Sequence, residues 1–152
     1  MPASVTAPVP QLVLDTNVVL DWLLFHDPSC HSLADALTTG RACWLSTAAM
    51  RDELMHVLGR GSLAKWQPDI DAIQDAYSRW SRPIQAGSIQ TPARLRCTDP
   101  DDQKFIDLAW QLGNSRLLSR DRAVLKLARR ARAAGFAILV PEAWSDPLPA
   151  GG

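Results

Sequence analysis

Acidic residues stand at three predicted turns of the chain, each at the start of a helical pattern. Asp15 closes the apolar run 12–14, Asp102 ends an acidic turn, and Asp121 follows the run 116–118. In an open α/β sheet, the crevice at the carboxyl ends of the strands is where ligands collect. Acidic side chains gathered at one such edge can bind a hard divalent cation through their oxygen atoms.

A metal ion would offset two costs that a cluster of carboxylates brings. Neighbouring carboxylates repel one another, and burying one without a partner is expensive. Mg²⁺ or Mn²⁺ is the expected ion, because the candidate ligands are oxygens and no cysteine or histidine spacing accompanies them. Glu53 can reach the same edge only if the helix that carries it rises beside the first strand.

Each of these acids also has a purely structural interpretation. Asp15 and Asp99 can cap helices, because a carboxylate at that position accepts hydrogen bonds from free backbone N–H groups. Asp102 and Asp121 fall in first helical turns, where the helix dipole favours an acid. Glu53 can be an exposed residue on a helix. The metal hypothesis therefore depends on the acids converging, which no single acid can establish.

Short apolar runs that alternate with helical patterns supply the elements that would position these acids. We predict strands over residues 11–14, 42–45, 83–86, 116–118 and 137–140. We predict helices over 16–25, 28–40, from Ser46 or Thr47 to about Leu58, 68–80, 99–112 and 123–134. Such alternation implies right-handed crossovers. The predicted fold is a three-layer α/β/α protein with a central parallel sheet of about five strands.

The length of 152 residues fits one domain, which we expect to span residues 1–152 with a core over about 11–144. The last residues, 145–152, contain two prolines and two glycines and are expected to fray, as are the first ones. No apolar run approaches the roughly 20 residues that cross a bilayer, and the first residues lack the pattern of an export signal. We therefore expect a cytoplasmic protein without a membrane partner.

Charge is balanced over the whole chain but unevenly distributed along it. There are 16 basic and 16 acidic residues, yet the segment 116–152 has seven basic residues and three acidic ones. Four basic residues form one stripe along the predicted helix 123–134 and the residue just before it: Arg122, Lys126, Arg129 and Arg130. This stripe could guide an RNA backbone toward the acids. A solvated helix face is the alternative interpretation.

The order and spacing of the motifs resemble a known family. The relevant segments are Leu14-Asp15-Thr16-Asn17-Val18, then Ser46 with Arg51-Asp52-Glu53-Leu54, then Cys97-Thr98-Asp99-Pro100-Asp101-Asp102-Gln103-Lys104-Phe105, and Leu117-Leu118-Ser119-Arg120-Asp121. Together they resemble the PIN-domain nucleases over roughly residues 12–144. The segment 97–105 is similar to the subgroup described as toxin components of toxin–antitoxin systems.

The resemblance implies a catalytic and metal-binding quartet of Asp15, Glu53, Asp102 and Asp121, with Asn17, Ser46 and Ser119 as supporting polar residues. It implies hydrolysis of phosphodiester bonds in single-stranded RNA with Mg²⁺ or Mn²⁺, an antitoxin protein as partner, and a homodimer. The chain departs from the family pattern at Ser119-Arg120, where threonine and glycine are common, and at Ala123, where relatives often have an acid. These departures bear on the occupancy of a second metal site.

Two other functions are compatible with parts of the sequence. A non-catalytic module of the same fold could bind RNA or a protein partner, because fold alone does not establish activity. An aspartyl-phosphate hydrolase also begins with an aspartate after an apolar strand. That chemistry commonly uses a second acid two positions later, where this chain has Asn17.

Overall fold

Five parallel strands form one sheet in the order β3-β2-β1-β4-β5, with β1 at its centre. The computed structural model describes residues 9–87 and 90–145. The strands are β1 Gln11–Leu14, β2 Cys43–Ser46, β3 Ser81–Pro83, β4 Ser115–Leu118 and β5 Ala137–Leu139. The expected fraying of residues 145–152 and of the first residues concerns segments that lie outside the described residues, except for Ser145 and the residues from position 9 onward.

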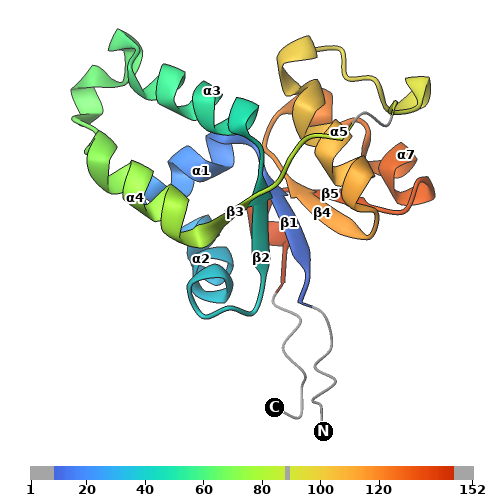
Figure 1. Cartoon of the computed structure of the whole chain (residues 1–152), viewed down its shortest axis with the longest axis horizontal. Helices are drawn as coiled ribbons and strands as arrows, with labels where there is room; N and C mark the ends of the chain where they lie inside the picture. The colour runs from blue at the N-terminus through green and yellow to red at the C-terminus, as the bar shows by residue number, and fades with distance from the viewer. Residues whose placement is uncertain (1–8, 88–89, 146–152) are drawn as a thin grey trace, which may run out of the picture.

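Helices cover both faces of this sheet, so the predicted three-layer α/β/α architecture is confirmed (Figure 1). One face carries α1 Thr16–Leu23, α2 His31–Thr38, α3 Ala48–Leu58 and α4 Ile70–Trp80. The other carries α5 Gln103–Leu112, α6 Arg122–Leu125 and α7 Ala128–Ala133. Short 3₁₀ segments complete the described elements: η1 Pro28–Cys30, η2 Gly61–Trp66, η3 Ala93–Leu95, η4 Pro100–Asp102 and η5 Pro141–Ala143.

The alternation of side chains along β1 builds both halves of the core. Leu12 and Leu14 pack with α1, α2 and α3, whereas Val13 packs with α5 and α6 on the other face. All three are almost fully buried, as expected for a strand with helices on both sides. Trp44 of β2 lies edge-to-face against Tyr77 of α4, with ring centroids 4.6 Å apart.

Several element ends follow the local sequence signals. Thr47 caps α3 through its hydroxyl, which accepts from the backbone N–H of Met50 at 3.4 Å. Gly40 and Gly113 lie just beyond α2 and at the end of α5, with φ angles of 78° and 81° that disfavour residues with a side chain. The chain therefore turns back into a strand soon after each of these helices.

Two predicted elements are wrong in their position or continuity. The third strand begins at Ser81, directly after α4, and not at Pro83, because Ser81–Pro83 pairs with Trp44–Ser46 of β2. At the sheet edge its side chains are largely exposed, so they show no apolar pattern. The predicted helix 123–134 divides into α6 and α7, because the N–H of Leu127 bonds to the carbonyl of Val124 in a tighter turn.

Within the described ranges, no helix combines the length and the apolar character that crossing a membrane requires.

Candidate metal centre

The candidate site lies at the carboxyl ends of the two central strands. β1 and β4 pair in register, with Leu14 opposite Leu118, so Asp15 and the segment before Asp121 leave the sheet side by side. The N–H of Asp15 still bonds to the carbonyl of Leu118 at 3.0 Å. Strand order reverses between β1 and β4, and this switch point is where open α/β sheets form their ligand crevice.

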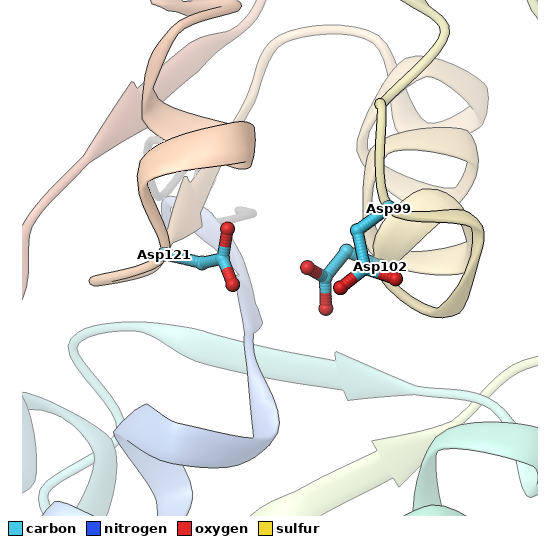
Figure 2. A group of neighbouring side chains, drawn as sticks. All are labelled: Asp99, Asp102 and Asp121. Carbon is cyan, nitrogen blue, oxygen red and sulfur yellow. The ribbon is translucent and has the colours of Figure 1, made fainter.

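Three carboxylates face one another beside this crevice. Asp99, Asp102 and Asp121 each offer an oxygen atom, and these atoms all lie within 4.8 Å of one another. Figure 2 shows the carboxylate of Asp121, at the start of α6, pointing toward the two carboxylates at the start of α5. Asp99 caps η4 and Asp102 is its last residue, and residues three apart in a 3₁₀ turn lie on the same side.

Asp15 is the most deeply placed acid of the group, with a relative exposure of 3%. One of its oxygens accepts from the hydroxyl of Ser119 at 2.6 Å, and the other accepts from the N–H of Asn17 at 3.3 Å. The Ser119 hydroxyl oxygen in turn accepts from the N–H of Asp121 at 3.0 Å. Ser119 thus connects Asp15 to Asp121 and fixes the orientation of both.

The carboxylates that gather at this site also cap helices. Asp15 caps α1, Asp99 caps η4 through the N–H of Asp101 at 3.0 Å, and Asp121 caps α6 through the N–H of Ala123 at 2.8 Å. Asp99 and Asp121 each use one oxygen atom, Oδ1, for the cap. The capping interpretation of Asp15 and Asp99 is therefore correct, whereas Asp121 caps its helix instead of lying in the first turn. Capping does not exclude a metal-binding role.

The electrostatics of Asp102 favour a cation beside it. Burial, followed by the charges of Asp15, Asp121 and Asp99, raises the pKa of Asp102 to about 7. Its Oδ2 atom is buried and has no hydrogen-bond partner among the described residues. Burial also raises the pKa of Asp15, and the charges of Asp121 and Glu53 add to this effect. A divalent cation fits this set of oxygen donors and would satisfy the orphaned atom.

Cys97 lies next to these acids but differs from them in chemistry. Burial is the main cause that raises the pKa of its thiol, and the nearby charges of Asp102, Asp121 and Asp99 raise it further. A thiol must lose its proton to act as a nucleophile or a metal ligand. The position of Cys97 therefore favours a protonated side chain that fills the core.

Glu53 reaches the site from α3 but has its own partners. One carboxylate oxygen accepts from the hydroxyl of Thr16, and the other forms an ion pair with Lys104. The charge of Glu53 raises the pKa of Asp15, although burial and the charge of Asp121 raise it more. The structure thus brings Asp102 and Asp121 together, places Asp15 beside them, and sets Glu53 against Lys104.

The supporting polar residues lie in different surroundings. Asn17 gives its backbone N–H to Asp15, and its side chain is exposed. Ser119 bonds directly to Asp15. Ser46 is buried against the hydroxyl of Tyr77 and lines a cavity of about 670 Å³ between the ends of β2 and β3 and the start of α3. Arg51 also lines this cavity, with its guanidinium 5.6 Å from the centre of the Tyr77 ring.

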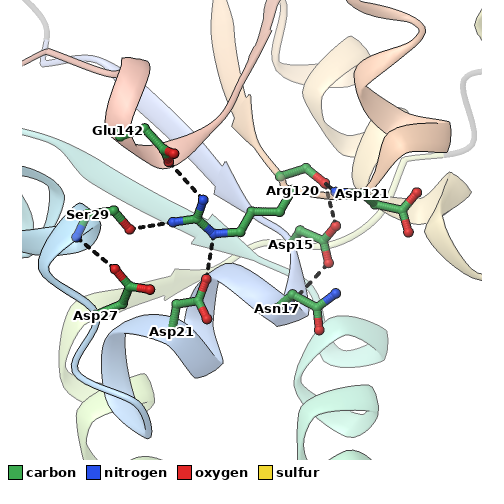
Figure 3. A network of polar contacts seen from close by, with 9 residues as sticks. Asp15, Asn17, Asp21, Asp27, Ser29, Arg120, Asp121 and Glu142 are labelled. Carbon is green, nitrogen blue, oxygen red and sulfur yellow. Dashed lines mark hydrogen bonds and ion pairs between the residues drawn. The ribbon is translucent and has the colours of Figure 1, made fainter.

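Arg120, which departs from the family pattern, points away from Asp15 and Asp121 (Figure 3). Its guanidinium bonds to Asp21 of α1 at 2.6 Å, to Glu142 of η5 at 2.8 Å, and to the hydroxyl of Ser29 in η1. The side chain therefore connects three segments on one side of the sheet. Ser119 provides the hydroxyl at the neighbouring position of the turn.

The four basic residues of the predicted stripe are all exposed, and they lie on two helices and the turn between them. Arg122 belongs to α6, Lys126 follows it, and Arg129 and Arg130 belong to α7. Arg130 donates to the backbone carbonyl of Arg94 at 3.2 Å, so it also holds η3 in place. Arg122 lies next to Asp121, at the edge of the acidic cluster.

Sequence reasoning missed two residues of this site. From sequence Asp99 is interpreted only as a cap, although its spacing of three from Asp102 is the signal that a 3₁₀ turn would align the two carboxylates. Lys104 has no such signal, because its partner Glu53 is 51 positions away in the chain. Only the packing of α3 beside the start of α5 brings this pair together.

The comparisons with known proteins agree with the geometry. A family model described as PIN domain matches residues 11–123, a range that includes every acid of the site. No curated protein matches the chain at a significant level.

Removing the charge of Asp102 should change how stability depends on pH. The folded-state pKa of about 7 exceeds the usual value of 3.8, so the metal-free protein loses stability as pH rises through this interval. Asp102→Asn has no such titration. Asp102 is partly exposed, so solvent screens its interactions and reduces the effect. We expect the free energy of unfolding of the wild type to fall by about 1–2 kcal/mol relative to that of the variant between pH 5 and pH 8. Urea unfolding in EDTA measures this difference, and parallel pH profiles would contradict it.

Arg120→Ala should destabilise the fold without disturbing the acids. The variant cannot form the three charge-assisted hydrogen bonds of this partly exposed side chain, so we expect a decrease of about 1–2 kcal/mol in the free energy of unfolding. Arg132→Ala, at an exposed position of α7, is the matched control and should change stability little. Thermal unfolding measures both, and an Arg120→Ala variant as stable as the control would show that these hydrogen bonds contribute nothing.

Proposed function

Since the chain belongs to the PIN domain family, a family of metal-dependent nucleases, we propose that it is an endoribonuclease that hydrolyses phosphodiester bonds of single-stranded RNA. The observation that carries this proposal is the convergence of Asp99, Asp102 and Asp121, with Asp15 beside them and with the Oδ2 atom of Asp102 left without a hydrogen-bond partner among the described residues. A carboxylate cluster alone would repel a phosphate group, so the proposed activity requires a cation in the crevice.

Asp15, Asp102 and Asp121 would hold the ion, which we propose to be Mg²⁺ or Mn²⁺, and Asp99 is placed to contribute a fourth carboxylate. When bound, such an ion can lower the pKa of water and stabilise negative charge on a phosphate group. Glu53 completes the proposed catalytic quartet from the far side of the site, where Thr16 and Lys104 hold its carboxylate.

The remaining polar groups keep the acids in position. Ser119 holds Asp15 through its hydroxyl proton and Asp121 through its oxygen, so one side chain sets the separation of two proposed ligands. The helix starts capped by Asp15, Asp99 and Asp121 restrict the rotation of these carboxylates. A site built on element ends in this way loses little conformational entropy when it binds an ion.

Two surfaces near the acids support an RNA substrate. Arg122 and Lys126 follow Asp121 in the chain and can contact the phosphate backbone, with Arg129 and Arg130 extending the positive charge along α7. The cavity lined by Ser46 and Tyr77 opens at the same edge of the sheet, and its volume of about 670 Å³ is large enough for a nucleotide. We assign the basic residues to the RNA backbone and the cavity to a nucleotide next to the cleaved bond.

The resemblance of segment 97–105 to toxin components supports a cellular role. We propose that the protein is the toxin of a toxin–antitoxin pair, acts in the cytoplasm as a homodimer, and is neutralised by an antitoxin protein. Expression of the wild type should then arrest growth, while expression of Asp15→Asn should not. Unimpaired growth with abundant wild-type protein would contradict the toxin role. The nuclease proposal is tested independently by RNA cleavage in vitro.

Asp15→Asn should abolish metal-dependent RNA cleavage. Asparagine retains the cap of α1, so the fold should persist, but it removes the negative charge nearest the sheet. We expect at least about a 100-fold decrease in the cleavage rate with Mn²⁺ or Mg²⁺, comparable to the effect of removing a main electrostatic group from an active site. Cleavage of a labelled single-stranded RNA, with and without EDTA, measures the effect.

Asp75→Asn is the matched control for this measurement, because Asp75 is exposed on α4, away from the acids. It should cleave RNA at the wild-type rate. Equal cleavage by Asp15→Asn and wild type would place the activity elsewhere. Metal-dependent RNA binding without cleavage by any variant would favour a non-catalytic binding module, and a phosphoenzyme trapped on Asp15 would favour an aspartyl-phosphate hydrolase.

Charge reversal at Arg122 and Lys126 should weaken RNA binding, because both side chains would then repel phosphate groups. For a single strand, the slope of log affinity against log salt changes by about 0.7 for each phosphate that is no longer neutralised. We therefore expect the double variant Arg122→Glu and Lys126→Glu to show a shallower slope and weaker binding to RNA oligonucleotides in Ca²⁺. A salt slope equal to that of wild type would show that these side chains form only a solvated face.

A further inference from the structure

An ion pair lies at the border of the acidic site, between Glu53 of α3 and Lys104 of α5. The ammonium nitrogen of Lys104 lies 2.5 Å from Oε1 of Glu53, and it also donates to the backbone carbonyl of Asp101 at 2.6 Å. Both side chains are only 26% exposed. The ammonium is further held over the ring of Phe105, 5.1 Å from its centre. Lys104 is therefore fixed in place and is not a freely moving surface lysine.

This pair divides the acids into two groups. Asp99, Asp102 and Asp121 face one another, and none of the ion pairs among the described residues includes any of them. Glu53, in contrast, already has a positive charge on one oxygen and the Thr16 hydroxyl on the other. The pKa of Asp102 is raised mainly by burial, and then by the charges of Asp15, Asp121 and Asp99. Asp121 and Asp99 belong to the first group, and Asp15 lies beside it.

A second divalent ion in this crevice would need Glu53 as a ligand, since Glu53 is the remaining acid of the proposed quartet. The Lys104 ammonium is bonded to one Glu53 oxygen and the Thr16 hydroxyl to the other, so such an ion would have to displace one of these partners, and beside Lys104 it would also meet a positive charge at close range. Ala123, in the first turn of α6 beside Asp121, has no carboxylate that could serve instead of Glu53.

On the basis of the proposed metal-dependent activity, we propose that Lys104 takes the place of a second cation, so that the site binds a single divalent ion beside Asp15, Asp99, Asp102 and Asp121. An ammonium group has three N–H donors, and the Glu53 carboxylate and the Asp101 carbonyl use two of them. The third is available to an oxygen of the substrate phosphate. Lys104 is thus a positioning residue for Glu53 and a fixed positive charge next to the proposed metal.

The number of Mn²⁺ ions bound per chain tests this inference without relying on activity. Isothermal titration of the wild-type chain with Mn²⁺ should give one ion per chain. Lys104→Met keeps the aliphatic stem against Phe105 and removes the charge, so it should bind a second, weaker ion through Glu53. Lys104→Gln serves the same purpose if the methionine variant does not fold. Lys104→Arg keeps the charge and should bind one ion.

Two further variants identify the source of the second ion. Adding Glu53→Gln to Lys104→Met should return the count to one, because the carboxylate that the second ion needs is gone. Lys65→Ala removes the same charge from an exposed position of η2 and should still bind one ion. Two ions on the wild type, or one on both neutral Lys104 variants, would overturn the inference. No Mn²⁺ on the wild type would instead overturn the proposed metal-dependent function, and this inference with it.

Discussion

The mutual repulsion of carboxylates at the carboxyl edge of the sheet is the interaction on which the rest of the site depends. The fold buries Asp102 next to Asp15, Asp99 and Asp121, and burial together with these neighbouring charges raises the pKa of Asp102 to about 7. Backbone N–H groups and the Ser119 hydroxyl offset part of this repulsion by binding individual oxygens. The buried Oδ2 of Asp102 receives no such compensation from the described residues, so the arrangement is best matched to a bound cation.

Sheet topology determines which acids meet. The chain fills the sheet from β1 through β2 to β3, then returns to the other side of β1 for β4 and β5, and this reversal opens the crevice between the ends of β1 and β4. Asp15 and Asp121 border that crevice because they follow these two strands. The start of α5 adds Asp99 and Asp102, and α3 adds Glu53 from the opposite face (Figure 1). Lys104 then neutralises Glu53, the acid that stands apart from the group.

Much of this arrangement could be predicted from the sequence, and the failures have physical causes. Periodicity identifies β1, β2 and β4 because central strands are apolar on both faces, but the exposed edge strand Ser81–Pro83 has no such pattern. The turn at Leu127 depends on burying Val124 and Leu127 together, which local propensity does not reveal. Motifs identify Asp15, Asp102 and Asp121, whereas the pairing of Glu53 with Lys104 requires knowledge of helix packing. The sequence does not identify Asp99 as a site residue, because its capping role already explains its position. One carboxylate can nevertheless cap a helix and lie in a metal site.

A crystal of the protein soaked in Mn²⁺ would test the central claim most directly. Anomalous scattering locates the ion without any assumption about substrate. We predict a single peak bound to oxygens of Asp102 and Asp121, with Asp15 and Asp99 beside it and Glu53 still on Lys104. A crevice without an anomalous peak at saturating Mn²⁺, or acids turned away from one another, would contradict the account and leave only the three-layer fold.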